Sequence, residues 1–360
     1  MNDRIPLTCI APLLAALMLQ ACAVTGDHAH GEHHGASHLA NVQPDDLGRQ
    51  LYGTRHTMDA AMLAEMREID DFSGYTDEQI THVMALMGYD YTWPVSSTDT
   101  KGKTGVLILV HGLGDHGDAV LRDTLQPLGK TYPTTLALGM SMMTSDHIQL
   151  GINDLEASGA RKIIVVPVVS TRHNSLMRQW EYIFAQRDDA AYARVPRVDA
   201  GAEVRMAAAL EDHPLVGAMV NDYANEISRQ PQNEEVIIVA HGPVDPEENR
   251  QQLAILENVA SYLRANSAFA AVSVATLQDD APPEVRRERT RELRERVQRA
   301  NAQGREVLIV TTLLGTRIVQ ASLNRNLRGL DYRFNPKGLI EHPRFIEWIN
   351  WSVADTANKF

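Results

Sequence analysis

Two histidines stand directly after apolar, strand-like runs, and each is followed by glycine. The sequence reads VLILVHG over residues 106–112 and VIIVAHG over residues 236–242, so His111 and His241 occupy matching places. A third histidine, His173, closely follows the apolar run KIIVVPVV. Neutral imidazole ligates divalent metal ions and accepts protons near pH 7. Histidines in these positions therefore predict metal binding, proton transfer or both.

Charged side chains near these histidines provide secondary candidates. Glu181 lies on the helix predicted to follow the third histidine, where a carboxylate could complete a metal's coordination shell or relay a proton; a solvated helix position is the alternative. Arg172 and Arg178 could pair with substrate carboxylates or form surface salt bridges. Asp115 follows the first histidine in its loop, where it could line the entrance of the site.

Alternating apolar strands and helices extend from residue 104 almost to the end of the chain. This order is typical of an α/β fold with parallel sheets, and continuous Val/Ile/Leu runs indicate strands buried on both faces. Ligands of open α/β sheets bind beyond the carboxyl ends of the strands, so we expect His111 and His173 to meet there. The predicted strands are residues 105–110, 134–139, 162–169, 235–240, 270–276 and 306–314.

The two halves of this region repeat each other, which indicates a duplicated fold. Besides the His-Gly runs, SGARKIIVVPVV in the first half matches QGREVLIVTTLL in the second. The sequence predicts two pseudo-symmetric α/β lobes, residues 104–200 and 201–360. In this alignment Ile318 stands where the first half has His173. We expect the complete site in the first half, with His241 either facing the cleft or retained only as a strand-end cap.

A His-Gly pair after an early strand also occurs in α/β-hydrolases, where it helps to build an oxyanion hole. Such an enzyme needs the motif G-x-S-x-G at a strand-to-helix turn. The nearest approach is GMSMM at residues 139–143, which lacks the second glycine. A hydrolase also has no need of two strands that each end in His-Gly, so the sequence disfavours an α/β-hydrolase.

Residues 1–22 resemble a bacterial lipoprotein signal peptide. The apolar run IPLTCIAPLLAALML is too short for a stable transmembrane anchor, and it ends in LQAC at Cys22, the predicted site of lipidation. A secretory signal that is cut elsewhere is the alternative. Cys9 is the other of two cysteines in the chain, so a mature protein that starts at Cys22 has no intramolecular disulfide. We expect a lipid-anchored protein of the cell envelope that faces the periplasm or the exterior.

Residues 23–50 have the composition of a flexible tether. The stretch DHAHGEHHGASH contains almost no large apolar residue and cannot build a core. Its histidines could collect divalent ions loosely, or the segment could be a plain soluble linker. Residues 51–103 are expected to form a short helical extension. The histidines of the tether are His28, His30, His33, His34 and His38.

The charge of the chain limits its partners. The net charge of −12 argues against nucleic acid, because phosphate binding requires a basic surface. The arginine-rich stretch at residues 284–300 is interleaved with glutamate, which is the pattern of an exposed helix with ion pairs four residues apart. An anionic substrate would therefore need local arginine or lysine side chains.

In order along the chain, several motifs resemble the sirohydrochlorin cobaltochelatase family, the class II chelatases of the CbiX and SirB type. They are the strand followed by His-Gly, then VVPVV with a histidine close behind, and in the second half VAHGPVDPEENRQ, ATLQDDAP and GLDYRFNPKGLIEHPRFIEW. The resemblance covers about residues 104–350.

The resemblance implies two flavodoxin-like lobes that face each other across a cleft holding a tetrapyrrole. A divalent Co, Fe or Ni ion would be inserted there without an organic cofactor, which would make the protein a metal chelatase, a lyase. His111 and His173 are then the metal-binding and proton-accepting pair. A metal- or tetrapyrrole-binding lipoprotein without enzymatic activity is the alternative, and the His-rich tether and export favour it.

Overall fold

The structure is a computed structural model that describes residues 43–52, 59–69, 72–86, 89–315 and 318–360. Cys22, the signal segment and the tether histidines lie outside the described residues. No helix within those ranges is long and apolar enough to cross a membrane.

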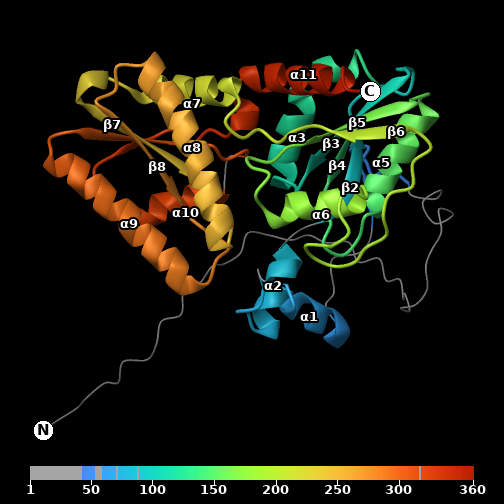
Figure 1. Cartoon of the computed structure of the whole chain (residues 1–360), viewed down its shortest axis with the longest axis horizontal. Coiled ribbons are helices and arrows are strands. Elements are labelled where there is room, and N and C mark those ends of the chain that lie inside the picture. Colours follow the sequence, from blue (N-terminus) through green and yellow to red (C-terminus); the bar gives the residue numbers. More distant parts are fainter. Residues whose placement is uncertain (1–42, 53–58, 70–71, 87–88, 316–317) are drawn as a thin grey trace, which may run out of the picture. The chain divides into compact units, whose positions relative to one another are not determined.

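In the first sheet four strands are parallel to one another, and two further strands extend one edge through antiparallel pairing (Figure 1). Its order is β1-β2-β4-β3-β5-β6, with β3 between β4 and β5. β1 and β2 belong to the stretch that the sequence predicted to be helical, and they extend the sheet beyond the expected fold. The strands are β1 (Gln50–Tyr52), β2 (Asp90–Pro94), β3 (Thr104–Val110), β4 (Thr134–Leu138), β5 (Lys162–Pro167) and β6 (Glu203–Met206).

The second sheet is parallel and repeats the connectivity of the first. Its order is β10-β9-β7-β8, so β7 lies between β8 and β9, just as β3 lies between β4 and β5 in the first sheet. The α/β class and the duplication predicted from the sequence are confirmed. The strands are β7 (Glu234–Ala240), β8 (Ala271–Thr276), β9 (Glu306–Thr311) and β10 (Arg333–Phe334).

Helices connect successive strands in both lobes (Figure 1). Two of them begin at polar caps: Asn174 accepts a hydrogen bond from the N–H of Met177, and Asp245 accepts one from the N–H of Glu248. The helices are α1 (Ala60–Arg67), α2 (Asp77–Leu86), α3 (Gly114–Thr124), α4 (Gln126–Gly129), α5 (Asp146–Ala157), α6 (Ser175–Ile183), α7 (Pro214–Ile227), α8 (Pro246–Asn266), α9 (Pro283–Ala302), α10 (Ile318–Asn326) and α11 (Arg344–Ala357), with short 3₁₀ turns at Pro231–Asn233 and Leu339–Glu341.

The boundary between the lobes falls later than the sequence suggested. β6 lies beyond residue 200 but pairs with β5 in the first sheet, so the division comes between β6 and α7. The strand was missed because its residues, EVRM, are only half-buried or exposed and show no apolar run.

One apolar core is shared by both sheets. Alternate residues of β3, such as Val106 and Ile108, join the same cluster as Val236 and Ile238 of β7. The opposite faces of the two strands enter separate clusters, one in each lobe. Each central strand is therefore buried on both sides, as continuous apolar runs require.

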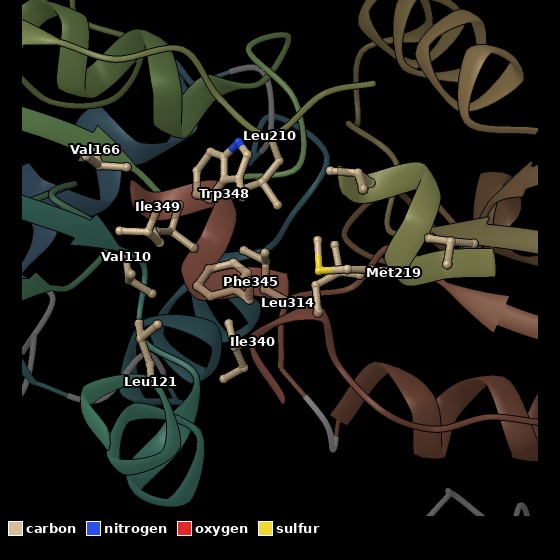
Figure 2. Packing of buried hydrophobic residues seen from close by; sticks show 14 of the residues in the cluster. Val110, Leu121, Val166, Leu210, Met219, Leu314, Ile340, Phe345, Trp348 and Ile349 are labelled. Carbon is tan, nitrogen blue, oxygen red and sulfur yellow. The ribbon is translucent and has the colours of Figure 1, made fainter. Parts of the chain in front are cut away.

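The C-terminal helix α11 fills the middle of this shared core. Phe345, Trp348 and Ile349 are fully buried, and they lie between Val110 of the first lobe and Met219 of the second (Figure 2). α11 packs against both α7 and β5. A helix from the end of the second lobe thus completes the core of the first.

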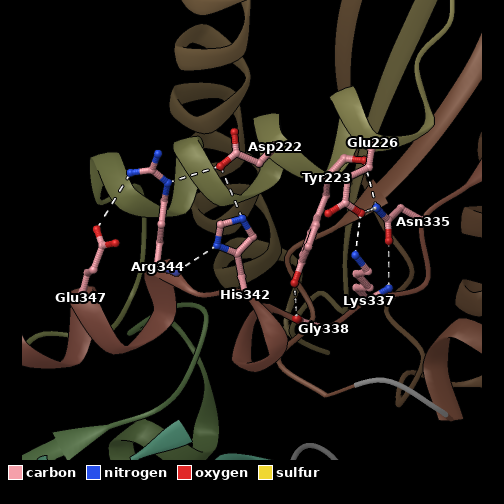
Figure 3. A network of polar contacts seen from close by, with 9 residues as sticks. All are labelled: Asp222, Tyr223, Glu226, Asn335, Lys337, Gly338, His342, Arg344 and Glu347. Atoms are coloured by element: carbon pink, nitrogen blue, oxygen red, sulfur yellow. Dashed lines mark hydrogen bonds and ion pairs between the residues drawn. The ribbon is translucent and has the colours of Figure 1, made fainter. Parts of the chain in front are cut away.

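Polar contacts fix the segment that leads into α11. His342 Nε2 lies 3.4 Å from Asp222 Oδ2, and Tyr223 donates its hydroxyl to the Gly338 carbonyl at 2.8 Å (Figure 3). Asn335 and Lys337 both bond to Glu226. These contacts join the segment to α7 and set the direction in which α11 leaves the second lobe.

Replacing Phe345 with alanine should destabilise the protein by about 3 to 5 kcal/mol, because the side chain is fully buried in the shared core. Asn350→Ala is the matched control on an exposed position of the same helix, and it should change the free energy of unfolding by less than about 0.5 kcal/mol. Urea denaturation followed by circular dichroism measures both values. Similar values for the two variants would contradict the role given to α11.

Candidate functional site

His111 is the first residue after β3, the central strand of the first sheet. The chain then turns through Gly112, whose φ of +89° lies in the left-handed region that favours glycine. Asp118 secures the turn by accepting a hydrogen bond from the Leu113 N–H at 2.6 Å. The imidazole is thereby held half-buried at the carboxyl edge of the sheet.

His241 occupies the equivalent place after β7, but its turn is tightly packed. Gly242 has a φ of +85°, and a Cβ added to it would lie 2.7 Å from the Cβ of Thr276. Gln278 donates its backbone N–H to the His241 carbonyl and its side-chain amide to the carbonyls of Pro243 and Val244. The backbone that carries this histidine is therefore fixed by β8 and the residues that follow it.

The two strand-end histidines interact electrostatically across the lobes. Burial lowers the pKa of the His111 imidazole, and the charge of His241 lowers this pKa further. Asp280 acts in the opposite direction on the same pKa. Because the net effect is a lowered pKa, His111 stays neutral and able to ligate a metal at pH 7.

Asp280 is a residue of this site that the sequence interpretation missed. Its Oδ2 lies 3.5 Å from His241 Nε2, and its carboxylate is exposed. Its backbone carbonyl accepts a hydrogen bond from the Tyr75 hydroxyl at 2.8 Å, so the connection between α1 and α2 reaches this point. Burial raises the pKa of the neighbouring Asp279. The signal was present in ATLQDDAP, since these aspartates follow the strand next to the one that delivers His241.

His173 lies between β5 and α6, at the same edge of the first sheet as His111. It is half-buried, and its backbone N–H donates to Thr171 Oγ1 at 3.1 Å. No hydrogen bond or ion pair joins its ring to another side chain in the part of the chain that the structure describes. In the same part, no group of three histidine, cysteine, aspartate or glutamate side chains is arranged to hold a metal ion.

The charged candidates each pair with an internal partner. Arg172 Nε donates to Glu211 Oε1 at 2.9 Å, and Arg178 forms an ion pair with Glu248. The second of these pairs joins α6 to α8 and thus links the lobes.

Glu181 and Asp115 are likewise paired. Glu181 Oε2 lies 3.4 Å from Arg187 Nη1, and Asp115 Oδ1 lies 3.1 Å from Arg49 Nη1. Asp115 is almost fully exposed at the start of α3. Electrostatic effects therefore link His111 with His241 and Asp280, whereas the other charged candidates are held in salt bridges with residues outside this group.

No protein-family model matches this sequence, and no curated protein sequence matches it. Among solved structures, SirB from Bacillus subtilis with Fe3+ aligns with a TM-score of 0.51 at 15% identity, over 72% of this chain and 99% of that chain. The sirohydrochlorin chelatase SirB from Bacillus subtilis subspecies spizizenii in complex with cobalt aligns with a TM-score of 0.50 at 14% identity, over 71% and 96%. The chain has the SirB fold.

The chelatase fold that the sequence motifs predicted is thereby confirmed. SirB is matched over almost its entire length, whereas 72% of this chain is matched. This protein therefore carries sequence beyond the SirB fold.

Alanine at the two equivalent glycines should have unequal effects. Gly112→Ala should cost about 1 kcal/mol, the strain of a left-handed alanine, because nothing lies within 4 Å of the added Cβ. Gly242→Ala carries the same strain and in addition meets Thr276 and Asn249, which should cost about 1 to 3 kcal/mol more. Guanidinium denaturation of the two variants tests this order, and equal losses would refute it.

Proposed function

We propose that the protein inserts a divalent metal ion into a tetrapyrrole. In this proposal His111 binds the metal ion and His241 accepts the protons that leave the macrocycle. The observation that supports this is the coupling between two imidazoles that stand at equivalent strand ends of a duplicated, SirB-like fold. The metal is Co²⁺, Fe²⁺ or Ni²⁺ and the macrocycle is of the sirohydrochlorin type. The chemistry needs no organic cofactor.

His111 serves as the metal ligand in this proposal. A divalent ion binds imidazole only in the neutral form, and the lowered pKa of His111 favours that form. One or two imidazoles leave most of the ion's coordination sphere open to incoming pyrrole nitrogens. His173 is the proposed second ligand from the first lobe, because its loop leaves the strand beside β3. Glu181, on the helix after this loop, is a further proposed ligand.

His241 and Asp280 provide the route for protons. Two pyrrole N–H protons leave the macrocycle as the ion enters, and neutral imidazole accepts a proton readily near pH 7. The Asp280 carboxylate, 3.5 Å from His241 Nε2, stabilises positive charge on that ring. Because this carboxylate is exposed, protons pass from it to solvent.

We expect His111→Ala to lower the metallation rate about 100-fold or more, because it removes the neutral ligand, and His241→Ala to lower it about 10-fold. His116→Ala is the matched control, since His116 is exposed on α3 a few residues from His111, and this variant should keep the full rate. The measurement follows the absorbance of sirohydrochlorin with Co²⁺ against the spontaneous rate. Stoichiometric binding without turnover by the wild type would overturn the enzymatic proposal in favour of a carrier.

Membrane attachment through Cys22 is part of the proposal. The segment before it has the pattern of a lipoprotein signal, and the mature body would be held at the membrane of the cell envelope by lipid alone. Cys22→Ser should leave the protein unlipidated, so it should shift from the membrane fraction to the soluble fraction on cell fractionation. A covalent lipid detected by mass spectrometry on the serine variant would show that the anchor lies elsewhere.

A further inference from the structure

One small apolar cluster is unusually rich in methionine. It joins α1 and α2 to the segment after β4, and five of the eleven residues that the structure describes in it are methionines, from a total of 13 in the chain. The other cores are built mainly from leucine, isoleucine and valine. The five are Met66, Met84, Met140, Met142 and Met143.

These methionines come from separate elements, and their side chains pack in one cluster. Met66 lies on α1 and Met84 on α2, two helices that contact each other (Figure 1). The other three methionines lie within four residues directly after β4. Met142 is buried, whereas Met140 and Met143 are partly exposed to solvent.

The loop that carries three of these methionines is held in a strained conformation. Ser141, between Met140 and Met142, is fully buried and has a φ of +57°, which is rare for a residue with a side chain. Gly139 before it packs directly against Asp90, and no Cβ would fit there. The carboxylate of Asp90 accepts a hydrogen bond from the backbone of Met140.

Three side chains maintain this conformation of Ser141. Trp180 Nε1 donates to its hydroxyl at 3.3 Å, and Gln179 Nε2 donates to its carbonyl at 3.1 Å. His147 Nε2 lies 3.5 Å from the same hydroxyl. Strain that the surroundings over-determine in this way is characteristic of functional loops. The loop presents its methionines in a fixed arrangement.

We propose that this methionine cluster binds a soft monovalent metal ion, Cu(I), through thioether sulfurs. Thioethers are soft ligands that select Cu(I) over the divalent ions that imidazole and carboxylate prefer. Neutral sulfur ligands in an apolar site also suit an ion of single charge, because no second charge has to be buried with it. The proposed ligands include neither His111 nor His241, so this proposal does not rest on the chelatase proposal.

The experiment compares thioether with hydrocarbon at the same positions. Met140, Met142 and Met143 are replaced together by leucine, which keeps volume and apolarity but removes sulfur. All samples are full-length chains in which the five tether histidines are alanine and Cys9 and Cys22 are serine, so neither the tether nor a thiol contributes; this background serves as the wild type of the comparison. Cu(I) affinity is measured without oxygen by competition with bathocuproine disulfonate. We expect the triple variant to bind about tenfold more weakly or worse, with a small change in melting temperature.

Met219→Leu is the matched control, because Met219 is a buried methionine of the shared core outside this cluster, and it should leave Cu(I) affinity unchanged. X-ray absorption of the wild-type complex should show sulfur ligands, and this result does not depend on any variant folding. Met143→Leu alone, at a partly exposed position, should give a smaller loss. Equal affinity in the wild type and the triple variant, or a spectrum with only nitrogen and oxygen ligands, would overturn the proposal.

Discussion

The common apolar core between the sheets determines the geometry on which the rest of the protein depends. One face of β3 and one face of β7 pack into the same cluster, and α11 fills the space between them. His111 and His241 extend these two strands by one residue each. Side chains in the core therefore fix the placement of the two strand ends that carry these histidines. A cavity in this core would change stability and the electrostatic coupling of the histidines together.

The main features of the fold could be predicted from the sequence because they depend on long apolar runs. Such runs identify the buried strands, and their repetition identifies the duplication. The strands that escaped prediction are short or lie at edges: β1, β2, β6 and β10. β6 is mostly half-buried and so has no continuous apolar signal. The path of α11 was equally hidden, because an amphipathic pattern shows that a helix is covered but not which lobe covers it.

The site could be predicted only in part, for a related reason. A histidine directly after a buried strand must lie at the sheet edge, so the places of His111 and His241 follow from local sequence. The importance of Asp280 depends on β8 pairing with β7, which is a property of sheet order. The partners of Arg172 and Arg178 likewise lie far away in the chain, at Glu211 and Glu248. Local sequence does not contain these long-range pairings.

The two His-Gly turns share a backbone conformation but differ in how much room surrounds them. Around Gly112 there is open space, whereas Gly242 is enclosed by Thr276, Asn249 and Gln278. The chain thus has two copies of one turn, and of these two only the first has room for a larger side chain at its glycine. The backbone of the second turn is held in place by its neighbours, whereas the first turn has open space beside its glycine. Substitutions that add volume should therefore be tolerated beside Gly112 in the loop after β3 and rejected beside Gly242 in the loop after β7.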